Sequence, residues 1–164
     1  CLDLMTQYVY TLKNVMLKNK EICIQESCYN EAAVFIATPC ILQEIPSQKK
    51  FEGINKPKNI VSFYNGDRFK RDNNYRAGYR LIMLRLRNDN GSMRIWEDTS
   101  KKIKKSDIKS LLLHELSHTM CNHVTYREDE NHDDDFYKSE RFITMMANNS
   151  TEVKVIEDKI KKLL

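Results

Sequence analysis

All four histidines of this 164-residue chain fall between residues 114 and 132. His114 and His118 stand four residues apart, with Glu115 directly after the first of them, in the pattern His-Glu-x-x-His. Residues four apart share one helical face, so both imidazoles can bind one ion about 2.0–2.1 Å from each nitrogen. Glu115 lies roughly 100° around the helix from His114 and can reach a water beside the ion without binding the ion itself. This spacing favours zinc-dependent hydrolysis with Glu115 as the general base.

A catalytic zinc site of this kind needs a third protein ligand and an open position for water. His123 follows His118 by five residues, so its ring would point elsewhere unless the helix ends near Met120. His132 comes after a loop long enough to fold back and directly before a predicted helix. We therefore expect His132 to be the third ligand. The alternatives are His123 and the acids Glu128, Glu130 and Glu140.

The histidine pair must sit on a helix, and the sequence around it predicts one over residues 106–120. Ser106 is a good N-cap, and Asp107 suits the positive end of the helix dipole. Leucines and Ile108 give this segment an apolar stripe that can face a core. The same periodicity predicts further helices over residues 6–21, 133–147 and 151–164.

Strands are expected in the middle of the chain, over residues 59–64 and 79–87. In the second, Leu81, Met83 or Leu84, and Leu86 alternate with arginines, which predicts an apolar face made of these residues. The Asn90-Gly91 pair is a strong hairpin signal, so residues 93–96 are expected to return as an adjacent strand. Together the elements predict an α+β fold, with a small central sheet packed on the histidine-bearing helix and a helical C-terminal part.

Length and composition bound the protein class. With 164 residues, 41% of them hydrophobic, we expect a single domain over residues 1–164. The longest uncharged stretch, residues 32–43, is too short to span a membrane. Five cysteines without a Cys-x-x-Cys pair favour reduced thiols, and therefore an intracellular protein of the nucleus or cytoplasm.

Positive charge is concentrated in residues 68–105, which carry 12 basic and 4 acidic side chains. Such a basic segment can follow a nucleic-acid backbone, and interleaved aromatic residues can stack on bases. A solvated face of a lysine-rich protein explains the same pattern equally well. The candidate phosphate contacts are Arg68, Lys70, Arg71 and Arg76, and the candidate stacking residues are Phe69, Tyr75 and Tyr79.

Over about residues 79–145 the chain resembles the WLM family of zinc metalloproteases and, more distantly, the SprT/Spartan proteases. The resemblance rests on "HELSH" followed by "HDDDFY", with "LIMLRLR" and "SLLL" before them. In those families a third histidine follows in a His-x-x-x-Phe context, which here falls on His132 and Phe136. The thirteen residues between His118 and His132 are closer to the Spartan length. The resemblance implies a zincin-like fold, a bound zinc ion, and cleavage of proteins bound or crosslinked to DNA.

Two other functions remain open from the sequence. The histidines could hold a structural zinc, with Cys121 as fourth ligand, in a module that binds nucleic acid without cleavage. The chain could also be a zinc hydrolase unrelated to nucleic acid. For a protease, the candidate oxyanion stabilisers are Tyr126, Arg127 and Tyr137, although Tyr137 is better explained by helix packing. The oligomeric state is not predicted.

Overall fold

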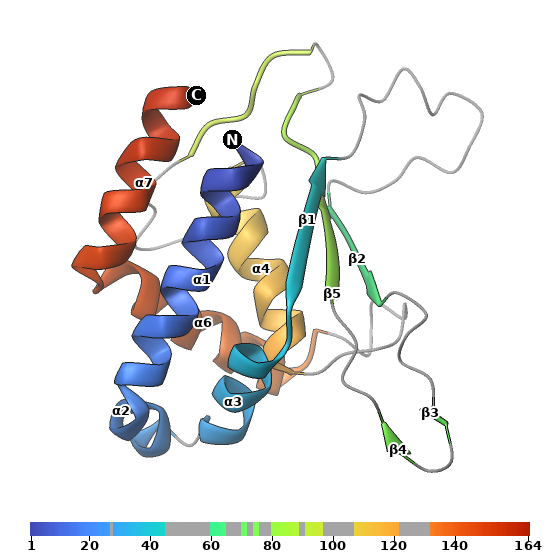
Figure 1. Ribbon diagram of the computed structural model, residues 1–164, viewed down its shortest axis with the longest axis vertical. Coiled ribbons are helices and arrows are strands. Elements are labelled where there is room, and N and C mark those ends of the chain that lie inside the picture. The colour runs from blue at the N-terminus through green and yellow to red at the C-terminus, as the bar shows by residue number, and fades with distance from the viewer. Residues whose placement is uncertain are drawn as a thin grey trace.

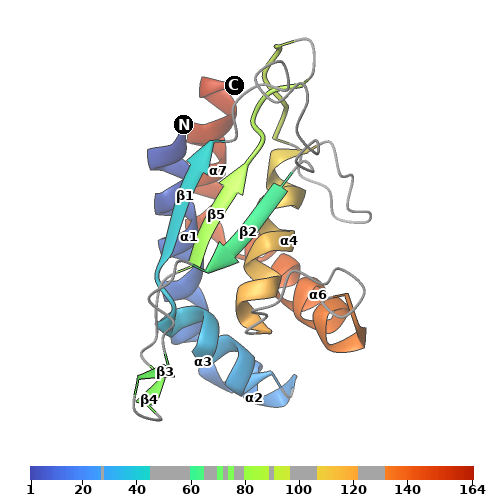
Figure 2. The same ribbon diagram turned by 90° about the vertical axis from the view of Figure 1, so that its right-hand side faces the viewer.

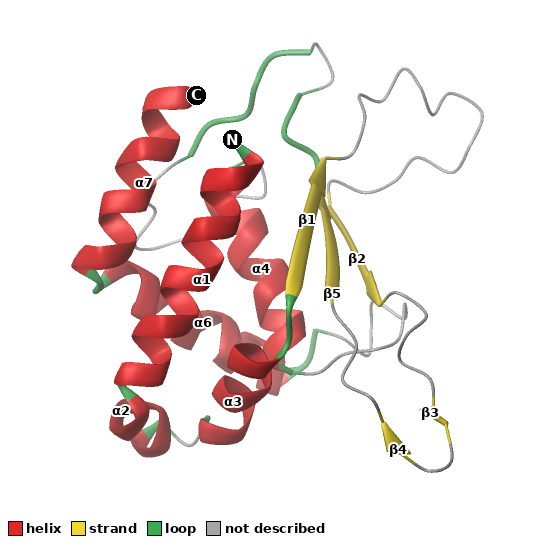
Figure 3. Ribbon diagram, viewed as in Figure 1, coloured by secondary structure: helices red, strands yellow, loops and turns green. Residues whose placement is uncertain are grey.

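The structure is a computed structural model of the chain. It describes residues 1–26, 28–44, 60–64, 70–71, 74–75, 80–88, 91–96, 107–121 and 132–164, and of the short segments 60–64, 70–71 and 74–75 it describes the backbone. The chain is α+β, as the sequence predicts, and most of its described elements are helices (Figures 1 and 3).

The helices and strands follow one another in an order that places the strands between two helical parts. The elements are α1 (Leu2–Lys18), α2 (Lys20–Gln25), α3 (Tyr29–Ala37), β1 (Cys40–Glu44), β2 (Ile60–Tyr64), β3 (Lys70–Arg71), β4 (Asn74–Tyr75), β5 (Arg80–Leu84), α4 (Ile108–Met120), α6 (Asp134–Asn148) and α7 (Thr151–Leu163). The predicted strands over 59–64 and 79–87 and the predicted C-terminal helices are confirmed, with bounds shifted by a few residues.

One three-stranded sheet forms the framework, with strand order β1-β5-β2. β1 runs parallel to β5, and β2 runs antiparallel to it. β3 and β4 form a separate antiparallel pair. In Figure 2 the sheet faces the viewer and α1, α4 and α7 lie behind it, so the described helices cover one face of the sheet.

The buried face of β5 agrees only in part with the predicted apolar face. Arg80, Ile82 and Leu84 are buried, whereas Leu81 and Met83 are only partly buried. Of the residues predicted for the apolar face, Leu84 and Leu86 are buried, at 1% and 3% exposed. Inside the protein, a guanidinium nitrogen of Arg80 donates to the main-chain carbonyl of His118 at 3.5 Å, so the arginine side chain can point toward α4.

The expected return strand over residues 93–96 is reduced to a single antiparallel bridge between Arg87 and Met93. Gly91 does make the turn, with φ of 86°, a conformation that glycine adopts without strain. The predicted helix over residues 6–21 is likewise divided, because Asn19 leaves the helical conformation (φ −105°, ψ 41°) and separates α1 from α2.

α1 supplies much of the core. Its buried apolar side chains recur at helical spacing and include Met5, Tyr8, Leu12 and Met16, each fully buried. α1 packs on α7 and β1, and α4 packs on β5, α3 and α6. The helix that carries the histidine pair is therefore enclosed by other elements on several sides.

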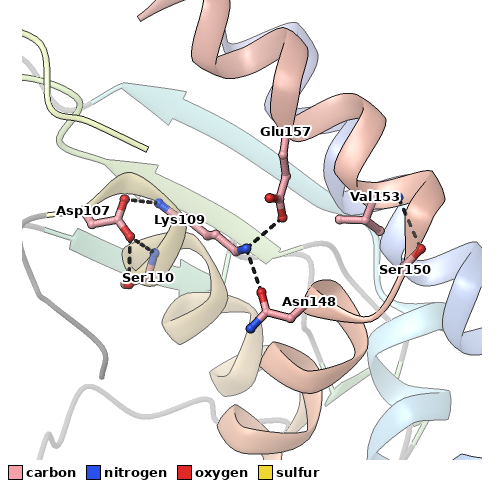
Figure 4. Close-up of polar contacts among 7 residues, drawn as sticks. All are labelled: Asp107, Lys109, Ser110, Asn148, Ser150, Val153 and Glu157. Atoms are coloured by element: carbon pink, nitrogen blue, oxygen red, sulfur yellow. Dashed lines mark hydrogen bonds and ion pairs between the residues drawn. The ribbon is translucent and has the colours of Figure 1, made fainter. Parts of the chain in front are cut away.

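α4 begins one residue later than the sequence predicts, because Asp107 and not Ser106 is its N-cap. The Asp107 carboxylate accepts hydrogen bonds from the backbone N–H groups of Lys109 and Ser110, each at 3.2 Å, and from the Ser110 hydroxyl at 2.9 Å (Figure 4). A carboxylate can satisfy two exposed backbone donors at once, which a serine hydroxyl cannot match.

We expect Asp107→Ala to lower the free energy of unfolding by about 1–2 kcal/mol and the melting temperature by about 2–8 °C, since the first turn of α4 loses its cap. Asp107→Asn retains one acceptor oxygen and should cost less. Thermal unfolding of the three proteins measures this. An alanine variant as stable as the wild type would show that α4 does not depend on this cap.

Polar contacts also fix α4 against the C-terminal helices. The Lys109 ammonium lies 2.9 Å from a Glu157 carboxylate oxygen on α7 and donates to the Asn148 side chain at 2.8 Å (Figure 4). Both charged side chains are only 3% exposed. At the other end of α4, the Cys121 thiol donates to the Ser139 hydroxyl on α6 at 3.4 Å. These contacts tie both ends of α4 to α6 and α7.

The sequence predicts neither a membrane span nor a disulfide bond. In the part of the chain that the structure describes, no helix combines the length and apolar character that crossing a bilayer requires. All five cysteines are free thiols.

Candidate metal centre

Three histidine side chains converge between α4 and the start of α6. The Nε2 atom of His132 lies 3.3 Å from Nε2 of His114 and 3.2 Å from Nε2 of His118. One ring nitrogen from each of the three lies within 4.8 Å of the others, an arrangement that could hold a metal ion. Figure 1 shows how α6 passes beside the lower half of α4, which brings the two segments together.

Local structure explains the position of each imidazole. His114 and His118 lie on consecutive turns of α4 and so share a face. His132 directly precedes Asp133, the N-cap of α6, whose carboxylate accepts from the backbone N–H of Phe136 at 2.9 Å. This cap fixes where α6 begins and therefore where the residue before it stands.

The spacing of the nitrogens fits a tetrahedral ion. Two nitrogens that bind one zinc ion at 2.0–2.1 Å with a tetrahedral angle lie about 3.3–3.4 Å apart. The two distances from His132, 3.2 and 3.3 Å, agree with this value. Two of the three nitrogen–nitrogen distances therefore match a zinc site, and all three ring nitrogens lie within 4.8 Å of one another.

The hydrogen bonding of His114 adds a chemical reason for a cation. Its Nδ1 atom lies 2.9 Å from a carboxylate oxygen of Glu140. A carboxylate only accepts, so Nδ1 carries the hydrogen and Nε2 of the neutral ring presents a lone pair. A single proton could bridge only two of the three Nε2 atoms. A metal cation could accept a lone pair from each of them.

A buried aromatic ring forms one wall of the site. Phe136 has no exposed surface, and its ring centroid lies 4.4 Å from that of His118, stacked at 28°. The same ring meets His114 and His132 edge-on at 4.9 and 5.0 Å. Phe136 therefore holds the imidazoles apart from solvent on one side and restricts their rotation.

The other side of the site is more open. The His114 side chain is 28% exposed and His132 is partly exposed, whereas His118 is 8% exposed. Glu115, between the two α4 histidines, is 5% exposed. A ligand can therefore approach past His114 and His132, while Glu115, the residue after His114 on α4, is shielded from bulk water.

Several residues that the sequence nominates lie outside the described part of the chain, namely His123, Tyr126, Arg127, Glu128 and Glu130. α4 does end at Met120, the condition that His123 would need to become a ligand. Tyr137 is 46% exposed on α6, with its ring 5.5 Å from that of Phe136.

Cys121 does not belong to the group of converging ligand atoms. Its thiol instead donates to Ser139, and burial raises its pKa above the usual value. A thiol must lose its proton to bind zinc, so this environment makes Cys121 a poor fourth ligand.

Sequence reasoning named Glu140 only as an alternative ligand and missed its contact with His114. The structure places its carboxylate behind the imidazole, on the nitrogen that faces away from the site. A signal was available, because Glu140 lies four residues after Phe136 and three before Ile143 on the buried face of α6. An acid on an apolar helical face needs a partner, and His114 is that partner.

The basic segment 68–105 is not a uniform solvent-facing stripe. Arg80, Arg85 and Arg94 are 3%, 4% and 7% exposed, so they are not available to contact phosphates. Of the candidate phosphate contacts, Lys70 and Arg71 lie on β3, where the structure describes the backbone. Arg68 and Arg76, and the aromatic residues Phe69 and Tyr79, lie outside the described residues.

Comparison with known proteins adds no relative. No family model matches the chain, and neither the curated proteins nor the solved structures contain a significant match.

Proposed function

We propose that this chain is a zinc-dependent metalloendopeptidase with a zincin-like fold, and that it cleaves proteins bound or crosslinked to DNA. The observation that carries the proposal is the convergence of His114, His118 and His132 with Glu115 between the first two on α4. Three neutral imidazoles are a typical ligand set for zinc, and three protein ligands leave a coordination position open.

The residues around the ion would divide the reaction among them. Zinc, when bound, acidifies a water molecule and polarises the carbonyl of the scissile bond. The Glu115 carboxylate would serve as the general base that takes a proton from water and returns it to the leaving amine. Phe136 keeps one side of the site apolar, which strengthens each of these electrostatic interactions.

A polypeptide substrate is favoured by the sheet. Among the described strands, β2 lies at one edge of the sheet, and it contacts α4, the helix that carries the site. An extended peptide can bind an edge strand through main-chain hydrogen bonds, which would place its backbone along the sheet. A small ester or amide would have no use for such an edge.

The alternative of a structural zinc receives less support. Structural sites fill the fourth position with a protein ligand, often cysteine. Within the described residues the group contains three histidines, and the Cys121 thiol is directed to Ser139. A fourth position without a protein ligand among the described residues, together with Glu115 next to His114, favours hydrolysis.

Action on DNA-bound proteins rests on the resemblance to WLM and Spartan proteases and on the basic segment 68–105. If Arg68, Lys70, Arg71 and Arg76 bind phosphates, neutralising all four should lower the salt dependence of DNA binding. The log–log slope should fall by roughly 0.7–0.9 for each phosphate that the protein no longer neutralises. Zinc content should not change. A slope equal to that of the wild type would exclude these four side chains from the DNA interface.

The experiment that tests the function measures cleavage of one DNA-binding protein without DNA, with duplex DNA and with single-stranded DNA, at two salt concentrations. We expect faster cleavage with DNA, most at low salt, since charge contacts bring enzyme and substrate together. A preference for single strands that persists at high salt would indicate base stacking by aromatic residues. Equal rates in all three conditions would leave a zinc protease and remove DNA from its function.

A further inference from the structure

The buried carboxylate of Glu140 lies away from the point where the three Nε2 atoms converge, and it is shielded from solvent. Its Oε2 atom lies 2.9 Å from Nδ1 of His114, and the residue is 6% exposed. A buried carboxylate is costly unless it accepts strong hydrogen bonds, so this contact explains why the residue can be tolerated inside the protein.

The position of Glu140 follows from the same helix that places two other parts of the site. His132, Phe136 and Glu140 succeed one another at intervals of four residues, so they project on one side of α6 and the turn before it. The Ser139–Cys121 and Asn148–Lys109 contacts tie α6 to α4 on both sides of His114. These contacts fix the position of the Glu140 carboxylate along α4, opposite the His114 imidazole.

We infer that Glu140 is a positioning residue, which acts through His114 to hold that imidazole in the tautomer and orientation that zinc binding requires. The inference rests on the proposed function. By accepting from Nδ1–H, the carboxylate keeps the lone pair on Nε2 and fixes the ring against rotation. Its negative charge also makes the imidazole a stronger ligand.

The test compares zinc affinity, measured by competition with a chelator, in the wild type, Glu140→Ala and Glu140→Gln. We expect Glu140→Ala to weaken zinc binding by about 10–100-fold, as removal of such a partner commonly does. Glu140→Gln should weaken it less, because the amide oxygen still accepts from Nδ1–H but carries no charge. Both variants should also change the visible absorption spectrum of the Co²⁺-substituted protein, which reports the ligand field directly.

Glu157→Gln is the matched control, since Glu157 is also a buried glutamate and it pairs with Lys109, while the three histidines that converge do so around Nε2 atoms of α4 and the start of α6. This variant should lower the melting temperature and leave zinc affinity and the Co²⁺ spectrum as in the wild type. If Glu140→Ala binds zinc with wild-type affinity, the inference is overturned. The same holds if Glu157→Gln weakens zinc binding as much as Glu140→Ala does, because the effect would then reflect reduced stability alone.

The two proposals fail in different ways. A wild-type chain that binds no zinc overturns the proposed function and this inference together. A wild-type chain that binds zinc and cleaves protein, with Glu140 variants that bind zinc equally well, overturns only the role of Glu140.

Discussion

Glu115→Gln should reduce cleavage of a denatured protein substrate by at least about 100-fold, the usual scale for loss of a general base. The substitution keeps the size and shape of the side chain and removes its ability to take a proton from water. Zinc content should be unchanged, because the group of converging ligand atoms consists of three histidine nitrogens and Glu115 is not part of it. Single-turnover cleavage assays on the zinc-loaded proteins measure the effect.

Glu152→Gln provides the control, since Glu152 is an exposed residue of α7 that pairs with the exposed Lys18 at 3.6 Å. Its activity should equal that of the wild type. Undiminished cleavage by Glu115→Gln would rule out this carboxylate as the base. If neither wild type nor variant cleaves any of a broad set of DNA-bound proteins, the non-catalytic binding module becomes the better explanation.

Removal of any one converging histidine should empty the metal site. The free energy of binding zinc to a four-ligand site is about 10–16 kcal/mol. Each ligand therefore accounts for about 3 kcal/mol of binding free energy, which corresponds to a change in affinity on the order of a hundredfold to a thousandfold. We therefore expect His114→Ala, His118→Ala and His132→Ala each to lose zinc during purification. Metal analysis of the purified proteins gives the zinc-to-protein ratio.

His123→Ala is the variant that separates the two possible third ligands, and it should retain one zinc ion per chain. The helix that carries His118 ends at Met120, so helix continuation does not exclude His123. The position of the His132 ring nitrogen, at 3.2 and 3.3 Å from those of the other two rings, is the reason to expect it to be the ligand. An empty site in His123→Ala and a full one in His132→Ala would reverse this assignment.

Local patterns were enough to predict the helices near the site and the strands β2 and β5. Amphipathic periodicity over 133–147 and 151–164 located α6 and α7 to within one residue, because their apolar faces pack on the core. Four-residue spacing likewise predicted that His114 and His118 share a face, since this depends only on helix geometry.

Features that depend on tertiary contacts could not be predicted in the same way. The burial of Arg80 could not be predicted, because nothing in its neighbourhood reveals that the carbonyl of His118, 38 residues away, accepts from it. The contact between Glu140 and His114 spans 26 residues and depends on how α6 crosses α4. The chemistry of a buried side chain limits which residue types can be its partner. Only the packing of the helices determines which residue the partner is.

The geometry around His114 has a consequence for protein design. The three imidazoles, the ring that stacks on them and the carboxylate behind His114 are carried by two short segments, 114–118 and 132–140. Each of these side chains comes from α4, from α6 or from the residue just before the α6 cap, and none comes from a strand. A synthetic scaffold that reproduces the crossing of α4 and α6 can therefore accept both segments as a graft, and the connection between them can be redrawn to suit the new host.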